Sequence, residues 1–250
     1  SEMCIRDRWK DAIIQLHDPK NLNKKGSFYK RLVFDEILSS FLINSKIRKS
    51  VKKLKKTRKK FSSNNIKHIT NKIDFELTKD QLKAINEIND DLRSGQKMFR
   101  LLQGDVGSGK TIVALTSILN VINSKFQVAF MAPTEILAQQ HYNLAKSLLP
   151  DNVKIDILTS KTDNKIRKKI INDLENHQID LLIGTHSLFQ NKINYRKLGL
   201  IIIDEQHKFG VKQRKKLSDK GGKNCDILVM SATPIPRTLS LIHISEPTRL

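Results

Sequence analysis

Short apolar runs alternate with longer segments of helical periodicity from about Phe75 onward. In the longer segments, apolar residues recur every three or four positions, which is the spacing of one face of a helix. Strands that alternate with helices favour right-handed crossovers and a parallel sheet covered by helices on both faces. The pattern therefore predicts an α/β fold. The predicted strands are FRLLQ, QVAFMAP, VKIDILT, IDLLIGT, LGLIIIDE and DILVMSAT.

The part of the chain before this pattern has a different texture. Residues 27–60 have helical spacing, with Ile47, Val51 and Leu54 on one face, and residues 46–60 hold ten Lys or Arg and no acid. Such a run forms either a surface that follows phosphates or a solvated helix face. Residues 61–71, rich in Ser, Asn and Lys, predict a linker.

Composition changes this picture modestly. Lys and Arg number 46 against 25 acids, and the net charge of +21 favours a polyanionic partner such as nucleic acid. A chain rich in Lys, Ile and Asn is also what an AT-rich coding sequence produces without selection for binding. The two cysteines lack C-x-x-C spacing, so neither a zinc site nor a disulfide framework is predicted. With no membrane-span run and no signal-peptide pattern, we expect a cytoplasmic protein.

One glycine-rich segment carries a specific chemical prediction. GDVGSGKT, residues 104–111, matches G-x-x-x-x-G-K-[ST] between a predicted strand and a predicted helix. In such a loop the backbone amides face phosphate oxygens, Lys110 reaches the β and γ phosphates, and Thr111 binds Mg²⁺. The alternative is a glycine-rich turn with a surface lysine. The predicted nucleotide-binding residues of the loop are Gly104, Gly107, Ser108, Gly109, Lys110 and Thr111.

Two carboxylates follow the apolar run LIII. Asp204 lies where a second strand would deliver an acid to a nucleotide-bound Mg²⁺, and Glu205 would orient and deprotonate the attacking water. The alternative is a pair of solvated acids at the mouth of the sheet. Together with Lys110, these two acids are the predicted catalytic residues, and ATP and Mg²⁺ are the predicted cofactors.

In this order, GDVGSGKT, DEQH and SATPIPRT resemble the first motor domain of superfamily 2 helicases, a RecA-like P-loop NTPase domain. More narrowly, they resemble the bacterial RecG branch-migration helicases, as do LTKDQ, MAPTEILAQQH, IGTHSLFQ and EQHKFGVKQR. The resemblance implies an ATP-dependent DNA motor that acts on forks and four-way junctions in repair and recombination. It covers roughly residues 9–241.

The resemblance also implies roles for further residues. Gln81 would recognise the adenine edge, and Thr134 with Gly184, Thr185 and His186 would touch the DNA backbone. The residues that would relay nucleotide state toward DNA are Gln206, His207, Ser231, Ala232 and Thr233. Taken singly, a histidine such as His186 or His207 is more often a loop residue with a structural partner than a functional one, and only the position beside the P-loop acids favours a functional role here.

The expected organisation has four parts. Residues 9–74 resemble the helical region that joins the junction-binding wedge domain to the motor, and residues 75–241 form the motor domain. Residues 1–8 and 242–250 resemble translated sequencing adapters, so we expect a gene fragment with non-native ends. The wedge and the second motor domain, which carries an arginine finger worth about 10³ to 10⁵ in rate, are not expected within it. We therefore expect ATP binding, very slow hydrolysis and no unwinding.

Two other functions remain open at this stage. A transcription-repair coupling translocase shares much of the motif set, although DEQH fits it less well than the DEEH usual there. A non-catalytic nucleic-acid binder would use the basic run 46–60 instead of the P-loop.

Overall fold

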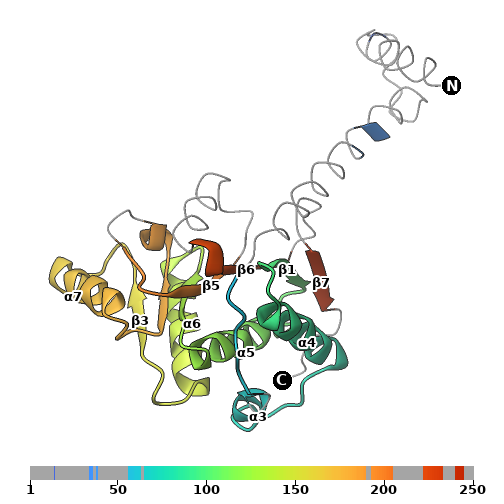
Figure 1. Ribbon diagram of the computed structural model, residues 1–250, viewed down its shortest axis with the longest axis horizontal. Coiled ribbons are helices and arrows are strands. Elements are labelled where there is room, and N and C mark those ends of the chain that lie inside the picture. The colour runs from blue at the N-terminus through green and yellow to red at the C-terminus, as the bar shows by residue number, and fades with distance from the viewer. Residues whose placement is uncertain are drawn as a thin grey trace. The chain divides into compact units, whose positions relative to one another are not determined.

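The computed structural model describes residues 14, 34–35, 38, 56–62, 65–189, 193–204, 222–232 and 240–244. The chain forms two compact units, Ser1–Ser50 and Val51–Leu250. In the first unit, the described residues Ile14, Phe34, Asp35 and Leu38 are helical. The architecture that follows is that of the second unit alone (Figure 1).

A seven-stranded sheet forms the centre of this unit, in the order β3-β4-β2-β5-β6-β1-β7, and every neighbouring pair is parallel. The predicted α/β fold with a parallel sheet is confirmed, and all six predicted strands are present. The strands are β1 (Phe99–Gly104), β2 (Gln127–Met131), β3 (Ile155–Leu158), β4 (Leu181–Gly184), β5 (Leu198–Asp204), β6 (Asp226–Ser231) and β7 (Ser240–Ile244).

Helices pack on both faces of the sheet. One apolar cluster joins alternate residues of the strands, such as Phe130 and Ile202, to α3, α4, α5 and α6. A second cluster joins the other alternate residues, such as Met131 and Ile203, to α7 and the short helix η2. The helices are α3 (Asn65–Thr70), α4 (Lys79–Arg93), α5 (Lys110–Asn123), α6 (Glu135–Leu148), α7 (Asn164–Glu175), η2 (His186–Phe189) and η4 (Gly222–Asn224).

The helix that follows the glycine-rich loop, α5, is buried all round. Every residue from Ile112 to Ile122 is buried, since α3 and α4 cover the side of α5 that faces away from the sheet (Figure 1). Its buried polar side chains form hydrogen bonds. The hydroxyls of Thr116 and Ser117 each donate to the carbonyl four residues earlier, at 3.0 Å. Asn120 donates to Asn89 of α4 at 2.7 Å.

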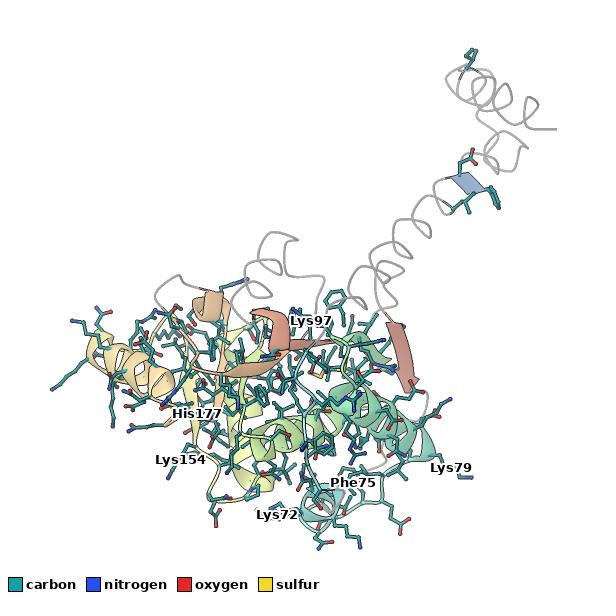
Figure 2. All side chains as sticks on the ribbon, in the orientation of Figure 1. Lys72, Phe75, Lys79, Lys97, Lys154 and His177 are labelled. Carbon is teal, nitrogen blue, oxygen red and sulfur yellow. The ribbon has the colours of Figure 1, made fainter. Side chains whose placement is uncertain are left out.

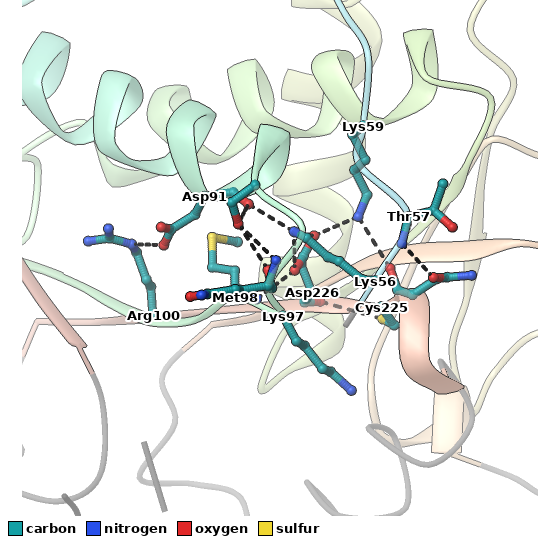
Figure 3. Close-up of polar contacts among 12 residues, drawn as sticks. Lys56, Thr57, Lys59, Asp91, Lys97, Met98, Arg100, Cys225 and Asp226 are labelled. Atoms are coloured by element: carbon teal, nitrogen blue, oxygen red, sulfur yellow. Dashed lines mark hydrogen bonds and ion pairs between the residues drawn. The ribbon is translucent and has the colours of Figure 1, made fainter. Parts of the chain in front are cut away.

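The end of the basic run is not a helix where it is described. Residues 56–60 have no regular secondary structure, and Lys56 and Lys59 are buried at the amino end of β6 (Figure 3). Their ammonium groups donate to the carboxylate of Asp226 at 2.6 and 2.5 Å. The prediction of a basic helix is therefore wrong for this segment, because two of its lysines neutralise a buried acid that lies far away in the sequence.

Asp226 has a third donor, the backbone N–H of Met98 at 2.7 Å. Lys56 also donates to the carbonyl of Asp91 in α4, and Lys59 donates to the carbonyl of Asn224. We call this group of Lys56, Lys59 and Asp226 the lysine clasp. It fixes the extended segment against β6 and α4 at the amino edge of the sheet (Figure 3).

The predicted linker 61–71 contains the helix α3. Ile69 of this helix is fully buried, and Asn65 donates to Asn120 of α5 at 2.8 Å. The packed unit thus begins at Val51, well before the boundary at residue 75 that the sequence pattern predicts. Six polar-rich residues form a helix here because tertiary contacts with α5 stabilise it.

The sheet continues past the predicted end of the motor domain. β7 pairs with β1 through Leu241 and Ile242, opposite Leu101 and Leu102. The strand takes in residues 242–244, for which the sequence predicts a non-native origin, and that origin stays a prediction. Among the described residues, no helix is long and apolar enough to cross a membrane.

Candidate nucleotide site

The predicted site residues gather at one edge of the sheet. In a parallel sheet the carboxyl ends of all strands lie at the same edge. The glycine-rich loop follows β1, Asp204 ends β5, and Ser231 ends β6, which lies between them. Thr134 follows β2, and Gly184 ends β4. The edge therefore has one part on β5, β6 and β1, which holds the residues predicted to bind phosphate and metal, and a neighbouring part on β2 and β4.

The loop has the backbone shape that a phosphate cradle needs. Gly107 and Gly109 have positive φ angles of 83° and 79°, which a residue with a side chain adopts only with strain. No atom lies within 4 Å of the position that a Cβ on Gly107 would take. No side chain caps α5, whereas Thr78 and Thr134 cap α4 and α6. The amino end of α5 is thus left open toward the loop, where its partial positive charge favours an anion.

Lys110 and Ser108 complete the loop. The ammonium group of Lys110 donates to the carbonyls of Gly104 and Asp105, at 2.6 and 2.7 Å, so it lies over the loop itself. The hydroxyl of Ser108 is buried and has no hydrogen-bond partner in the described structure. A buried polar atom without a partner costs stability, so these groups fit an anionic ligand that would engage them. Thr111 lies half-buried on the first turn of α5.

Gln81 is joined to the loop. Its side-chain oxygen accepts from Thr78 N–H at 2.9 Å, and its side-chain nitrogen donates to the carbonyl of Ser108 at 2.9 Å. The first contact belongs to a capping box at the start of α4. The residue is fully buried, so direct contact with a base requires the segment around it to move. Its role in adenine recognition stays a prediction.

The carboxylate of Asp204 is held by a histidine from the neighbouring helix layer. His141 of α6 contacts it with Nε2 at 2.9 Å from Oδ2, and both side chains are nearly buried. Because an ionised carboxylate only accepts hydrogen bonds, Nε2 is the donor. The imidazole stacks on Phe130 of β2, with ring centroids 4.6 Å apart. Among described side chains, His141 is the hydrogen-bond partner of Asp204.

The residues on the β2 and β4 part of the edge differ in their exposure to solvent. His186 is exposed, Thr134 is exposed and caps α6, and Thr185 is buried. Gly184 has a packing reason of its own, since a Cβ there would lie 2.2 Å from the carbonyl oxygen of Leu158. Their contact with DNA stays a prediction.

Some predicted residues are outside the described part of the chain. These are Glu205, Gln206, His207 and Thr233. Ser231 is fully buried at the end of β6, and Ala232 is half-buried beside it. Within the described residues no group of three or more His, Cys, Asp or Glu could hold a metal. A Mg²⁺ here would therefore take its protein ligands from Asp204 and Thr111, with the remaining positions left for phosphate and water, which suits this ion.

Comparison with known proteins identifies the family of the chain. A sequence profile of the DEAD/DEAH box helicases matches residues 78–242. The chain belongs to the DEAD/DEAH box helicase family. The chain is 44% identical over 233 residues to the ATP-dependent DNA helicase RecG of Borreliella burgdorferi, covering 92% of this chain and 33% of the relative. It is 45% identical over 238 residues to the RecG of Thermotoga maritima, covering 95% and 30%.

Solved structures agree with the sequence comparison. The structure of RecG bound to a three-way DNA junction matches with a TM-score of 0.74 and 41% identity, over 90% of this chain and 30% of that chain. A DEAD box protein from Methanococcus jannaschii matches with a TM-score of 0.58 and 22% identity, which shows the fold alone. The predicted resemblance to RecG is confirmed. The chain spans about a third of the length of these RecG relatives.

A cavity of about 570 Å³ lies between the end of α3 and the start of α4. Phe75, Leu77 and Leu82 give it an apolar lining, and Asp74 and Glu76 add carboxylates. Figure 2 places Phe75 next to α3 and the start of α4. The cavity is thus formed where the segment before the capping box passes α3.

Sequence reasoning missed His141. It stands in MAPTEILAQQH, but its signal is its place in the buried stripe of α6, formed by Ala138, His141, Ala145 and Leu148. A histidine among apolar residues at helical spacing needs a polar partner nearby. The acid that ends a neighbouring strand is the partner that this helicase domain supplies.

Proposed function

We propose that the chain is the ATP-binding motor domain of a RecG-type DNA helicase, which uses ATP to remodel branched DNA such as forks and four-way junctions. The family match supports a nucleotide-driven motor, and identity above 40% to RecG proteins supports this branch of the family. A neighbour of known structure is described as bound to a three-way DNA junction, which supports branched DNA as the partner.

One observation carries the proposal: the glycine-rich loop and Asp204 lie on strands separated only by β6. Met230 pairs with Asp204 on one side and with Leu102 on the other, so Asp204 is level with a residue two positions before the end of β1 at Gly104. Two strand spacings correspond to about 10 Å, which a triphosphate and its metal can bridge. Bound Mg²⁺ would supply charge neutralisation at the phosphates. Lys110, Thr111 and Asp204 hold and orient these groups.

The base end of the nucleotide is assigned to the cavity lined by Phe75, Leu77 and Leu82. Its apolar side chains suit the face of a purine, and Gln81, next to Leu82 in the sequence, would read the adenine edge once the segment around it moves. Because Gln81 also contacts Ser108 of the loop, base and phosphate binding act on one connected segment. This supports ATP over GTP.

DNA is assigned to the part of the edge on β2 and β4. Thr134, Thr185 and His186 lie there, next to the nucleotide part across β5. Ser231 and Ala232 end the strand between Asp204 and the loop, where a change in the nucleotide would reach them first. Gln206, His207 and Thr233 would extend this relay.

Hydrolysis requires more than the described site holds. Glu205 is proposed to orient and deprotonate the water. An arginine finger from a second motor domain would add about 10³ to 10⁵ in rate. We therefore expect the 250-residue chain to bind ATP and to hydrolyse it very slowly.

A fluorescent ATP analogue tests the proposal directly. Binding is measured with Mg²⁺ for the unmodified chain, Lys110→Ala and Asp204→Ala, with the exposed residue Lys154 changed to Ala as the matched control. Both site variants should weaken binding, and the control should not. Absence of binding by a chain that is folded by circular dichroism would overturn the proposal.

The non-catalytic alternative is weakened by the lysine clasp. Two lysines of the basic run are buried against Asp226 and cannot follow a phosphate backbone while the clasp is intact. Measurements of DNA binding distinguish the nucleotide-driven motor from the non-catalytic binder. A nucleotide-driven motor predicts that Lys110→Ala alters DNA affinity in the presence of ATP, whereas simple phosphate binding predicts a steep salt dependence that this variant leaves unchanged.

A further inference from the structure

His141 occupies a position where the fold would accept an apolar residue. It belongs to the buried stripe of α6 and is 8% exposed, with the face of Phe130 against its ring. Burying an imidazole without a hydrogen-bond partner is unfavourable. Among the described residues, the imidazole is compensated by one hydrogen bond, from its Nε2 to Oδ2 of Asp204 at 2.9 Å. The histidine and the acid that ends β5 are therefore a pair.

The placement of this pair follows from the sheet. β2 and β5 are neighbours, with Met131 opposite Ile203, so the helix that follows β2 starts beside the end of β5. Phe130 stacks on the ring from the sheet, and Asp204 engages its Nε2. The imidazole has little freedom to turn, and the bond it donates restricts the carboxylate in the same way.

We propose that His141 is a positioning residue that holds the Asp204 carboxylate in the orientation needed to bind the metal of the nucleotide. The hydrogen bond engages Oδ2, and no hydrogen bond from the described residues engages Oδ1, the oxygen proposed for metal coordination. Partners of this kind keep a ligand in its binding orientation before the metal arrives, and their loss typically weakens metal affinity or activity by about 10- to 100-fold. The inference rests on the proposed role of Asp204 as a metal ligand.

The test uses the ratio of two dissociation constants of a fluorescent ATP analogue, one in EDTA and one in Mg²⁺. The ratio reports how strongly the metal couples to the nucleotide, and a general loss of folding lowers affinity in both conditions. His141→Phe keeps the ring stack and removes the donor, whereas His141→Gln keeps a side-chain N–H. We expect H141F to lower the ratio by about 10- to 100-fold and H141Q to retain most of it.

A double-mutant cycle completes the test. In the Asp204→Asn background, H141F should change the ratio no further, because the two residues act through one contact. A ratio unchanged in H141F, or lowered equally in H141F and H141Q, would overturn the positioning role. So would an equal loss of affinity in EDTA and Mg²⁺. No metal coupling in the unmodified chain would refute the assigned role of Asp204 as well, and no nucleotide binding at all would refute the proposed function.

Discussion

Two buried aspartates lie at opposite edges of the sheet on neighbouring strands, and they differ in the number and charge of their hydrogen-bond partners. Asp226, which begins β6, accepts from two ammonium groups and a backbone N–H and is fully buried. Asp204, which ends β5, has one side-chain partner among the described residues, His141, and is 9% exposed. The first carboxylate is saturated by the fold, whereas the second retains capacity for a ligand. Burial of an acid alone therefore does not indicate a functional site; the number and charge of its partners do.

The largest expected effect is a loss in the free energy of unfolding when Asp226, the acid with three hydrogen-bond donors, is changed. Asp226→Asn leaves two buried lysines without a carboxylate, and breaking a buried ion pair from one side costs about 3–5 kcal/mol. Because whole domains are stable by only about 5–15 kcal/mol, this is a large share. Urea unfolding followed by circular dichroism measures it. A loss below about 1 kcal/mol would mean that water reaches the clasp and screens its charges.

The complementary change is Asp204→Asn. It keeps the shape of the side chain and removes the charge that a metal needs, so Mg²⁺-dependent nucleotide affinity should fall by more than about 10-fold. The unfolding free energy should stay within about 0.5 kcal/mol or rise, since functional groups are often not optimised for stability. A stability loss matching that of Asp226→Asn would remove the contrast between the two acids.

A smaller effect is expected from Lys59→Met. Asp226 would keep Lys56 and the amide of Met98, so the loss should be that of one charged hydrogen bond, about 1.5–3 kcal/mol. Methionine retains much of the buried volume beside Phe126. The matched control is Lys60→Met, an exposed residue next in sequence. Equal losses in the two variants would contradict a specific role for the clasp.

The smallest expected effect is a pH dependence of the clasp. Burial lowers the pKa of Lys56, with the charge of Lys59 acting in the same direction and Asp226 opposing it. A native pKa below the unfolded value means that unfolding takes up a proton between the two, so the unfolding free energy rises with pH over that interval. The gain from this group should appear as pH rises toward 10.5 and should be missing in Lys56→Met. Parallel pH profiles of the two chains would contradict it.

The strands and the nucleotide loop could be predicted from sequence because their signals are local. An apolar run followed by GDVGSGKT and a helical pattern contains both the strand end and the positive-φ glycines within a few residues. The lysine clasp could not be predicted in this way. Lys56 and Asp226 are 170 positions apart, and the lysine stands in a run that resembles a solvated surface.

The pairing of His141 with Asp204 was missed for a related reason. It depends on which strands are neighbours, and the order β2-β5 is set by crossovers that periodicity does not specify. The sequence predicts a linker at α3 because the segment is mostly polar. Its helix depends on one buried residue, Ile69, and on the hydrogen bond from Asn65 to Asn120 of α5. Local pattern thus indicated the elements, while tertiary contacts decided the partners.

The burial of α5 from Ile112 to Ile122 has a consequence for how the chain could respond to a nucleotide. The loop that would sense phosphate is mounted on a helix enclosed by the sheet, α3 and α4, with no surface along which the helix could slide. A helix enclosed in this way cannot translate along its axis when a ligand binds at its amino end. Any displacement that follows nucleotide binding is therefore expected to be taken up outside α5.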